Sequence, residues 1–90
     1  KYLSERGVSP TIARLSQKFE AIRQRELEKA FRSLDSLEPR EREIVEACTR
    51  GIVAKILHEP ITGLKAAEVK KEGDSFSEAL RKLFGLESDL

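Results

Sequence analysis

The 90-residue sequence predicts an all-α fold, an antiparallel bundle of three to four long helices. Charged residues make up 37% of the chain and apolar residues 39%, and this Glu-, Arg-, Lys-, Leu- and Ala-rich balance is typical of amphipathic helices. Apolar residues recur every three or four positions, and no stretch shows the strict alternation that predicts a strand.

The first helix is predicted over residues 9–35. Ser9 can cap its first turn, and Pro10 suits the first helical position, where a missing N–H costs nothing. The apolar stripe begins with Val8, Ile12, Leu15, Phe19 and Ile22. It then turns by roughly 90° around the helix and continues through Leu27, Ala30, Phe31 and Leu34. We therefore expect this helix to meet different neighbours along its length.

The second helix is predicted over residues 39–58, beginning at Pro39. Glu38 occupies the cap position, where Ser or Asp would be stronger. The apolar face is wide and consists of Ile44, Val45, Cys48, Ile52, Val53, Ile56 and Leu57. A face of this width covers two surfaces rather than one. Glu59 and Pro60 predict the end of the helix, because proline removes an N–H and disfavours helical backbone at the preceding residue.

Two shorter helices are predicted at residues 61–71 and 75–84, joined by a charged hinge that contains a glycine. Ser75 and Glu78 have the spacing of a capping box at the start of the last helix. Gly85 followed by Leu86 predicts a glycine stop with its hydrophobic contact at the end.

Charge and cysteine content exclude several classes of protein. The 17 basic and 16 acidic side chains are interspersed, unlike the concentrated basic field of a nucleic-acid binder. The single cysteine excludes an internal disulfide and fits a reducing compartment, so we expect a cytoplasmic protein. No stretch approaches the roughly 20 apolar residues that span a membrane, and no signal peptide is recognised. Because the chain opens on Lys1 rather than Met, we expect it to be part of a longer protein.

The sequence predicts no catalytic, cofactor-binding or metal-ligating residue. His58 is the only histidine, and no paired cysteines complete a metal site. We expect His58 near the C-terminus of its helix and Cys48 buried as a small apolar residue. About 15 Å separates them along that helix, which excludes a Cys–His dyad. A helix-turn-helix DNA reader around residue 36 would need a basic second helix, whereas this one is aliphatic.

Three stretches carry a family resemblance: SPTIARLSQKFEAIRQRELEKAFRSL, EPREREIVEACTRGIVAKILHEPITGLKAA and EALRKLFGL. In this order and spacing, they resemble the C-terminal dimerisation domain of glutamyl-tRNA reductase, from about Val8 to Leu86. The most specific parts are Ile22–Ala30 and Lys55–Pro60. Two departures are Glu38, where Ser is more usual, and Gly51 inside the second helix, which costs about 1 kcal/mol relative to Ala.

The resemblance implies a single dimerisation domain over residues 1–90. It also implies a parent oxidoreductase that reduces glutamyl-tRNA to glutamate 1-semialdehyde with NADPH, at the entry to tetrapyrrole (haem and other porphyrin) biosynthesis. In that family the nucleophilic cysteine and the NADPH site belong to two other domains, which these residues do not include. Cys48 does not match the nucleophile, so no catalytic or cofactor residue is carried over.

Helices of this length in one 90-residue chain leave part of their apolar stripes in water, so we expect a twofold homodimer to complete the bundle. The expected interface residues are Phe19, Ile22, Ile44, Val45, Cys48, Ile52, Val53 and Ile56. Two alternatives remain open. One is a tRNA-contacting helical module that uses Arg23, Arg25, Arg32, Lys55 or Lys70. The other is a stand-alone helical adaptor protein.

Overall fold

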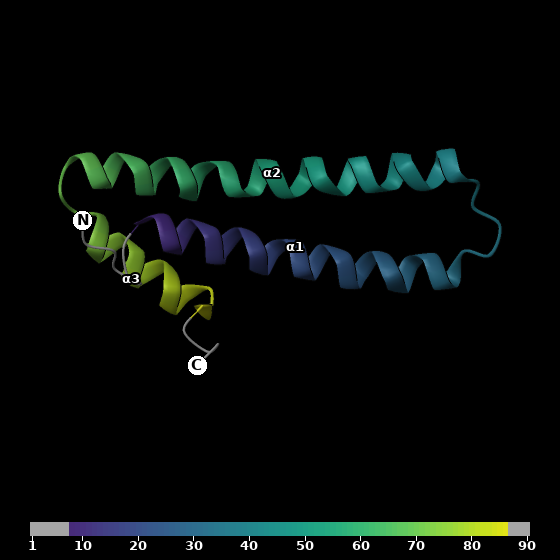
Figure 1. Cartoon of the computed structure of the whole chain (residues 1–90), viewed down its shortest axis with the longest axis horizontal. Helices are drawn as coiled ribbons and strands as arrows, with labels where there is room; N and C mark the ends of the chain where they lie inside the picture. The colour runs from purple at the N-terminus through teal and green to yellow at the C-terminus, as the bar shows by residue number, and fades with distance from the viewer. Residues whose placement is uncertain (1–7, 87–90) are drawn as a thin grey trace.

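A computed structural model describes residues 8–86, and within them the chain forms three helices and no strand. The helices are α1 (Val8–Ser33), α2 (Pro39–Val69) and α3 (Gly73–Leu83). Helices α1 and α2 run antiparallel side by side, and α3 folds back across one end of the pair (Figure 1). The predicted all-α bundle is confirmed.

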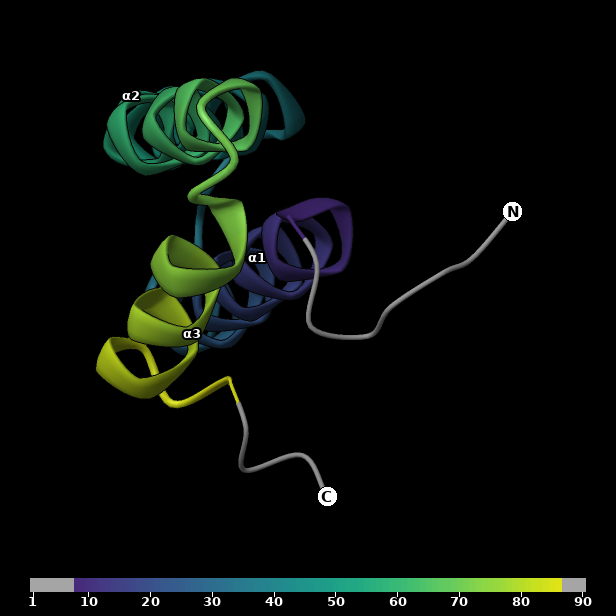
Figure 2. The same cartoon turned by 90° about the vertical axis from the view of Figure 1, so that its left-hand side faces the viewer.

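The molecule is elongated, with extents of 51 × 26 × 25 Å and a radius of gyration of 16.2 Å. A compact 90-residue domain would have a radius of gyration of about 12 Å. The length comes from α2, whose 31 residues span roughly 46 Å. At one end the three helices pack around a common centre, as the end-on view in Figure 2 shows. Toward the other end α1 and α2 contact only each other (Figure 1).

The predicted break at Pro60 is wrong. Helix α2 continues through this proline to Val69, so the expected helices 39–58 and 61–71 form one element. Proline inside a helix costs about 3 kcal/mol. Burial on either side offsets that cost, because Leu57 and Leu64 both pack into the interior of the molecule. His58 therefore lies exposed in the interior of a helix and not at its C-terminus.

The helix ends differ in part from the predicted ones. Helix α1 already includes Ser9, which is therefore not its cap. Pro39 does occupy the start of α2, and the backbone N–H of Glu38 donates to the Glu41 carboxylate at 3.0 Å. Helix α3 begins at Gly73, so Ser75 lies in its first turn and the predicted capping box is absent.

The core lies at the three-helix end, where Leu15, Leu57 and Leu86 from three parts of the chain meet. Phe19, Val53, Ile61 and Phe84 pack around them. Leu86 reaches the core because Gly85 takes a φ of +66°, a backbone conformation that glycine adopts without strain. The predicted glycine stop is thereby confirmed.

Close packing and a buried polar pair fix α3 against α1. A Cβ atom at Gly73 would lie 2.6 Å from Cγ2 of Val8 and 3.3 Å from Cα of Glu68, so a larger residue here would force the packing to shift. Farther along α3, Nη1 of the buried Arg81 donates to Oγ1 of Thr11 at 2.9 Å. The position of α3 is thus set by contacts between residues about 70 positions apart.

Candidate dimer interface

An apolar groove of about 460 Å³ lies between α1 and α2. Helix α1 contributes Phe19, Ile22, Leu27 and Ala30 to its lining. Helix α2 contributes Val45, Ile52, Val53 and Ile56. Arg23, Glu26 and Thr49 are the polar residues in the lining. Two antiparallel helices thus leave a long apolar surface between them, of the shape into which a further helix packs.

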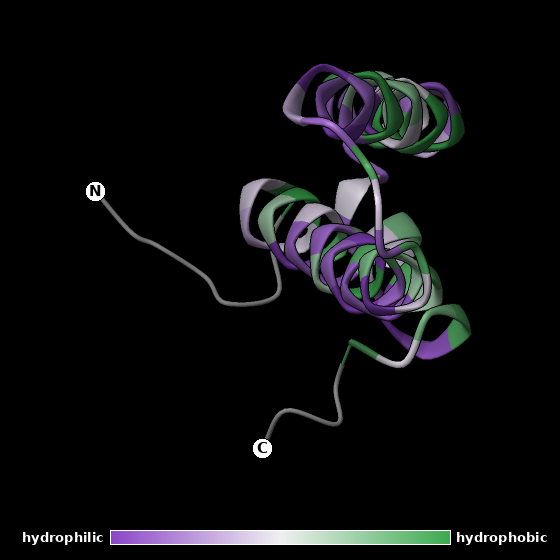
Figure 3. Cartoon of the chain, turned by 90° about the vertical axis from the view of Figure 1, so that its right-hand side faces the viewer, coloured by the Kyte–Doolittle hydropathy of each residue, from purple (hydrophilic) through white to green (hydrophobic). Residues whose placement is uncertain are grey.

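Large aliphatic side chains remain exposed on α1 and α2, and three of them, Ile22, Ile52 and Ile56, line this groove. Ile22, Ile44, Ile52 and Ile56 keep between 41% and 59% of their surface accessible to solvent. Three of them lie on α2 with Cys48 at a spacing of four residues, so they form one ridge on that helix. Figure 3 shows hydrophobic turns of α2 behind the hydrophilic turns nearest the viewer.

The structure places six of the eight expected interface residues in the lining of the groove: Phe19, Ile22, Val45, Ile52, Val53 and Ile56. Phe19 and Val53 also pack against the core, so they serve the fold of the chain itself as well. Ile44 and Cys48 lie outside the lining and extend the ridge of α2.

The expectation that Cys48 is buried is wrong, because its side chain is exposed. Four residues of an α-helix turn through about 400°, which is one full turn and a further 40°. Each residue of the ridge therefore points about 40° away from the direction of the residue four positions along. Ile56 lies at the edge of the face that packs on α1, and two steps back Cys48 has turned toward solvent.

A polar network that was not among the predicted features joins the two helices under the groove. Arg23 is only 7% exposed, and its guanidinium donates to both carboxylate oxygens of Glu20, from Nε at 2.9 Å and from Nη2 at 2.7 Å. Its Nη1 donates across to Thr49 Oγ1 on α2 at 3.1 Å. Thr49 in turn donates to the backbone carbonyl of Glu46 at 2.9 Å. Arg23 is therefore buried and hydrogen-bonded within its own chain, so its guanidinium is not exposed for contact with tRNA.

The network shifts the ionisation of both partners. Hydrogen bonds from Arg23 and then from Gln24 lower the pKa of Glu20 to about 2, from an ordinary value of 4.5. The carboxylate of Glu20 raises the pKa of Arg23 in return. The sequence held a signal for this pair, a Glu and an Arg three residues apart, with the Arg interrupting an apolar stripe.

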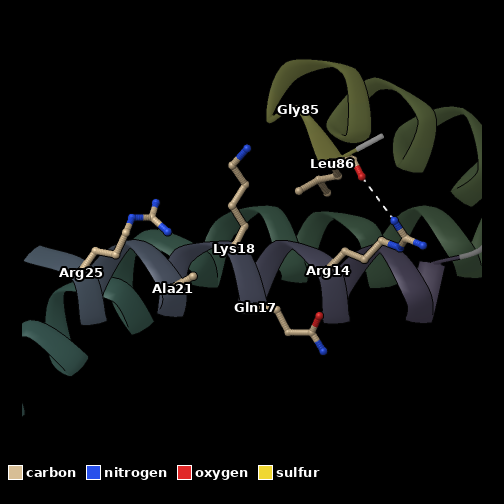
Figure 4. A pocket seen from close by; sticks show the side chains of 7 residues that line it. All are labelled: Arg14, Gln17, Lys18, Ala21, Arg25, Gly85 and Leu86. Atoms are coloured by element: carbon tan, nitrogen blue, oxygen red, sulfur yellow. Dashed lines mark hydrogen bonds between the residues drawn. The ribbon is translucent and has the colours of Figure 1, made fainter. Parts of the chain in front are cut away.

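A second hollow, of about 380 Å³, lies beside α1 where the end of α3 approaches it. Arg14, Lys18 and Arg25 line it from α1, and Gly85 and Leu86 line it from the other side (Figure 4). Arg14 donates from Nη1 to the carbonyl of Leu86 at 3.3 Å (Figure 4). Of the basic residues considered for tRNA contact, Arg25 alone lines this hollow. Arg32, Lys55 and Lys70 are exposed elsewhere.

The described part of the chain contains neither a cluster of metal ligands nor a helix that could span a membrane. Among residues 8–86, no three His, Cys, Asp or Glu side chains gather in a way that would hold a metal ion. None of the three helices in this range combines the length and the apolar character that crossing a bilayer requires.

Comparison with known proteins gives a consistent result. The sequence-family model of the glutamyl-tRNA(Glu) reductase dimerisation domain matches residues 1–86. A glutamyl-tRNA reductase of Trichodesmium erythraeum is 46% identical over 82 residues, which cover 90% of this chain and 19% of that protein. Those of Geotalea uraniireducens and Geobacter sulfurreducens are 42% and 40% identical, covering 98% and 100% of this chain and 20% and 21% of theirs.

The chain thus spans about a fifth of the length of the curated relatives that it matches. No solved structure matches it. The chain belongs to the glutamyl-tRNA reductase dimerisation-domain family.

Proposed function

We propose that two copies of this chain pair about a twofold axis through the groove between α1 and α2, and so join two molecules of a glutamyl-tRNA reductase. The observation that carries this proposal is a 460 Å³ apolar groove lined by the half-exposed Ile22, Ile52 and Ile56. A fully buried isoleucine contributes about 1.5–3 kcal/mol, and a symmetric dimer buries each patch on both copies.

The shape of the surface favours a second copy over a small ligand. Ile52 and Ile56 line the groove, and Ile44 and Cys48 continue their ridge along α2 outside it, so the surface offers both a ridge and a groove. A twofold axis lets the ridge of each copy enter the groove of the other, which makes a four-helix core.

Gly51 supports the same arrangement. A Cβ atom at this position would meet nothing within 4 Å, so the chain itself has no steric need for glycine there. Glycine in a helix costs about 1 kcal/mol relative to alanine. Close approach of the partner's backbone in a dimer would explain why glycine is present at position 51.

Membership of the family supports a role for this chain within a larger enzyme. We propose that the parent protein reduces glutamyl-tRNA to glutamate 1-semialdehyde with NADPH, in the cytoplasm, and that the other parts of the enzyme bind the tRNA and the cofactor. The contribution of residues 1–90, as a single dimerisation domain, is to hold two catalytic arms at a fixed separation.

Sedimentation equilibrium of the 90-residue chain at micromolar concentration tests the proposal. We expect a dimer for the wild type and a folded or partly folded monomer for Ile52→Asp, because the carboxylate would have to enter the apolar groove without a partner. The control is Lys55→Glu, at an exposed position on the same helix that does not line the groove, which should remain dimeric.

Two results would contradict the proposal. A wild-type chain that remains monomeric at 100-fold higher concentration would refute self-association through this domain. A fully dimeric Ile52→Asp variant would place the interface on another surface.

A further inference from the structure

The hollow of about 380 Å³ beside α1 is lined by three cationic side chains and by no acidic one. Arg14, Lys18 and Arg25 share one face of α1, at spacings of four and seven residues. The whole chain has a net charge of only +1, so its acidic and basic side chains nearly balance, but inside this hollow they do not. Because a concave surface that carries one sign of charge attracts ions of the opposite sign, the hollow is a candidate site for an anion.

Two small residues leave the space between these cations open. Ala21 lies between Lys18 and Arg25 on the same face, so only a methyl group covers the helix there. On the other side, a Cβ atom at Gly85 would lie 3.2 Å from Nζ of Lys18, so a side chain at this position would crowd the ammonium group. Figure 4 shows Lys18 and Arg25 rising from α1 on the side where Gly85 lies.

The charges of Lys18 and Arg25 are not neutralised within the described part of the chain, where neither side chain forms an ion pair. Glu20 is the only acidic residue between them in the sequence. Its two oxygens accept hydrogen bonds from Arg23, and one of them also accepts from Gln24. Both cations are exposed, so they can meet an anion from solvent.

Arg14 closes one end of the hollow. Its Nη1 donates to the backbone carbonyl of Leu86 at 3.3 Å, and its side chain is half-buried (Figure 4). A side chain that is already ordered loses less conformational freedom when a ligand binds. Arg14 therefore adds a positive charge at a fixed place beside Lys18.

The spacing of the exposed cations indicates the size of the anion. Lys18 and Arg25 start about 10 Å apart along the helix axis, which is farther than the oxygens of one phosphate group reach. An arginine can donate two parallel hydrogen bonds to one phosphate, and a lysine ammonium supplies a compact charge. Two linked phosphates, one at each cation, match this arrangement better than a single phosphate does.

We propose that this hollow binds an anion with two or more linked phosphate groups, held by Lys18 and Arg25 and attracted also by Arg14. Free polyphosphates and the backbone of a nucleic-acid strand share this chemistry. None of the three cations lines the groove between α1 and α2, so anion binding is independent of self-association through that groove.

The first test is calorimetric titration of the 90-residue chain with sodium tripolyphosphate at low ionic strength. We expect one tripolyphosphate per chain, and weaker binding of inorganic phosphate. Lys18→Gln and Arg25→Gln should each raise the dissociation constant about three- to tenfold, because each removes one charge-assisted contact at an exposed position.

Lys55→Gln is the matched control for this titration. It removes the same charge from an exposed position on α2 outside the hollow, so its dissociation constant should stay within about twofold of wild type. An equal loss in Lys55→Gln and Lys18→Gln would mean that only the net charge matters, and the proposed site would be wrong. A wild-type chain that does not bind tripolyphosphate would also overturn the proposal.

The second test locates the anion by amide chemical shifts in nuclear magnetic resonance spectra. Tripolyphosphate should shift the backbone amides of Lys18, Gly85 and Leu86, which line the hollow, and should leave that of Lys55 unchanged. Shifts of similar size at exposed lysines and arginines over the whole surface would contradict a single site.

A third titration separates the two sources of linked phosphates. Its probe is a single-stranded oligonucleotide of ten uridines. If a nucleic-acid strand is bound through all three cations, the logarithm of the association constant should fall with the logarithm of the salt concentration at a slope of about −2. Lys18→Gln should make that slope shallower. Binding of tripolyphosphate without the oligonucleotide supports the site and identifies a small polyphosphate, whereas binding of neither refutes it.

Discussion

Arg23 lies among apolar neighbours because every part of its guanidinium has an acceptor. Glu20 takes two of its hydrogen bonds and Thr49 on the facing helix takes a third. A buried cation without such partners would destabilise the fold by several kcal/mol. Arg23 therefore links α1 to α2 at the floor of the groove. The carboxylate of Glu20 neutralises its charge within the same chain, without any contribution from a second copy.

This pairing predicts a dependence of stability on pH. The pKa of Glu20 is about 2 in the folded chain, below its ordinary 4.5, so its contribution to stability is present above pH 4.5 and is lost as the pH falls toward 2. We expect the free energy of unfolding of the wild type to fall more steeply over this range than that of Glu20→Gln. Urea denaturation at pH 7, 4 and 2.5 measures the difference.

Glu28→Gln, at an exposed position on the same helix, is the matched control and should follow the wild-type curve. Parallel pH curves for the wild type and Glu20→Gln would show that the pair does not stabilise the folded state.

The turn between α2 and α3 ends one helix and starts the next within three residues. The N–H of Glu72 donates to the carbonyl of Ala67 at 2.7 Å, and that of Lys71 donates to the carbonyl of Glu68 at 3.0 Å. These two bonds form a Schellman motif, which requires a left-handed residue between them. Lys71 takes that conformation, with a φ of +64°, where glycine is the usual residue.

The same geometry predicts a stabilising substitution. A side chain in the left-handed region costs about 1–2 kcal/mol, so Lys71→Gly should raise the free energy of unfolding by about 1 kcal/mol after the entropy cost of glycine. Lys70→Gly is the control, since Lys70 has a φ of −87° and gains nothing from glycine. Equal effects of the two substitutions in denaturant titrations would mean that residue 71 is not strained.

The elongated shape of the chain is the physical reason to expect a second copy. Among residues 8–86, no third layer covers the groove side of α1 and α2 away from α3, and the exposed Ile22, Ile52 and Ile56 line that groove. A domain built of two layers around one core has to bury such faces against another element. In the proposed dimer that element is the α2 helix of the partner.

Association on this scale predicts that thermal stability depends on protein concentration. Raising the protein concentration from 1 to 100 μM stabilises the dimer relative to the unfolded chains by about 2.7 kcal/mol, through mass action. We expect the melting temperature, followed by circular dichroism, to rise by several degrees over this range. The Ile52→Asp variant should melt at one temperature throughout, and a wild type that does the same would argue against the dimer.

The all-α class, the helix start at Pro39 and the stop at Gly85 could all be predicted from the order of the residues. Each depends on residues close together in the chain: the spacing of apolar side chains, the missing N–H of proline, and the left-handed backbone that glycine allows. The surplus of apolar surface could be read in the same way, because a wide stripe on a long helix is visible in the amino-acid sequence.

The path of α2 through Pro60, the place of α3, the exposure of Cys48 and the network of Arg23 could not be predicted in this way. Each depends on side chains far apart in the sequence: the burial of Leu57 and Leu64 offsets the cost of the proline, and Arg23 finds an acceptor 26 residues away. Burial and hydrogen bonds of this kind form only once the helices pack together, and there they outweigh the local preferences of the backbone.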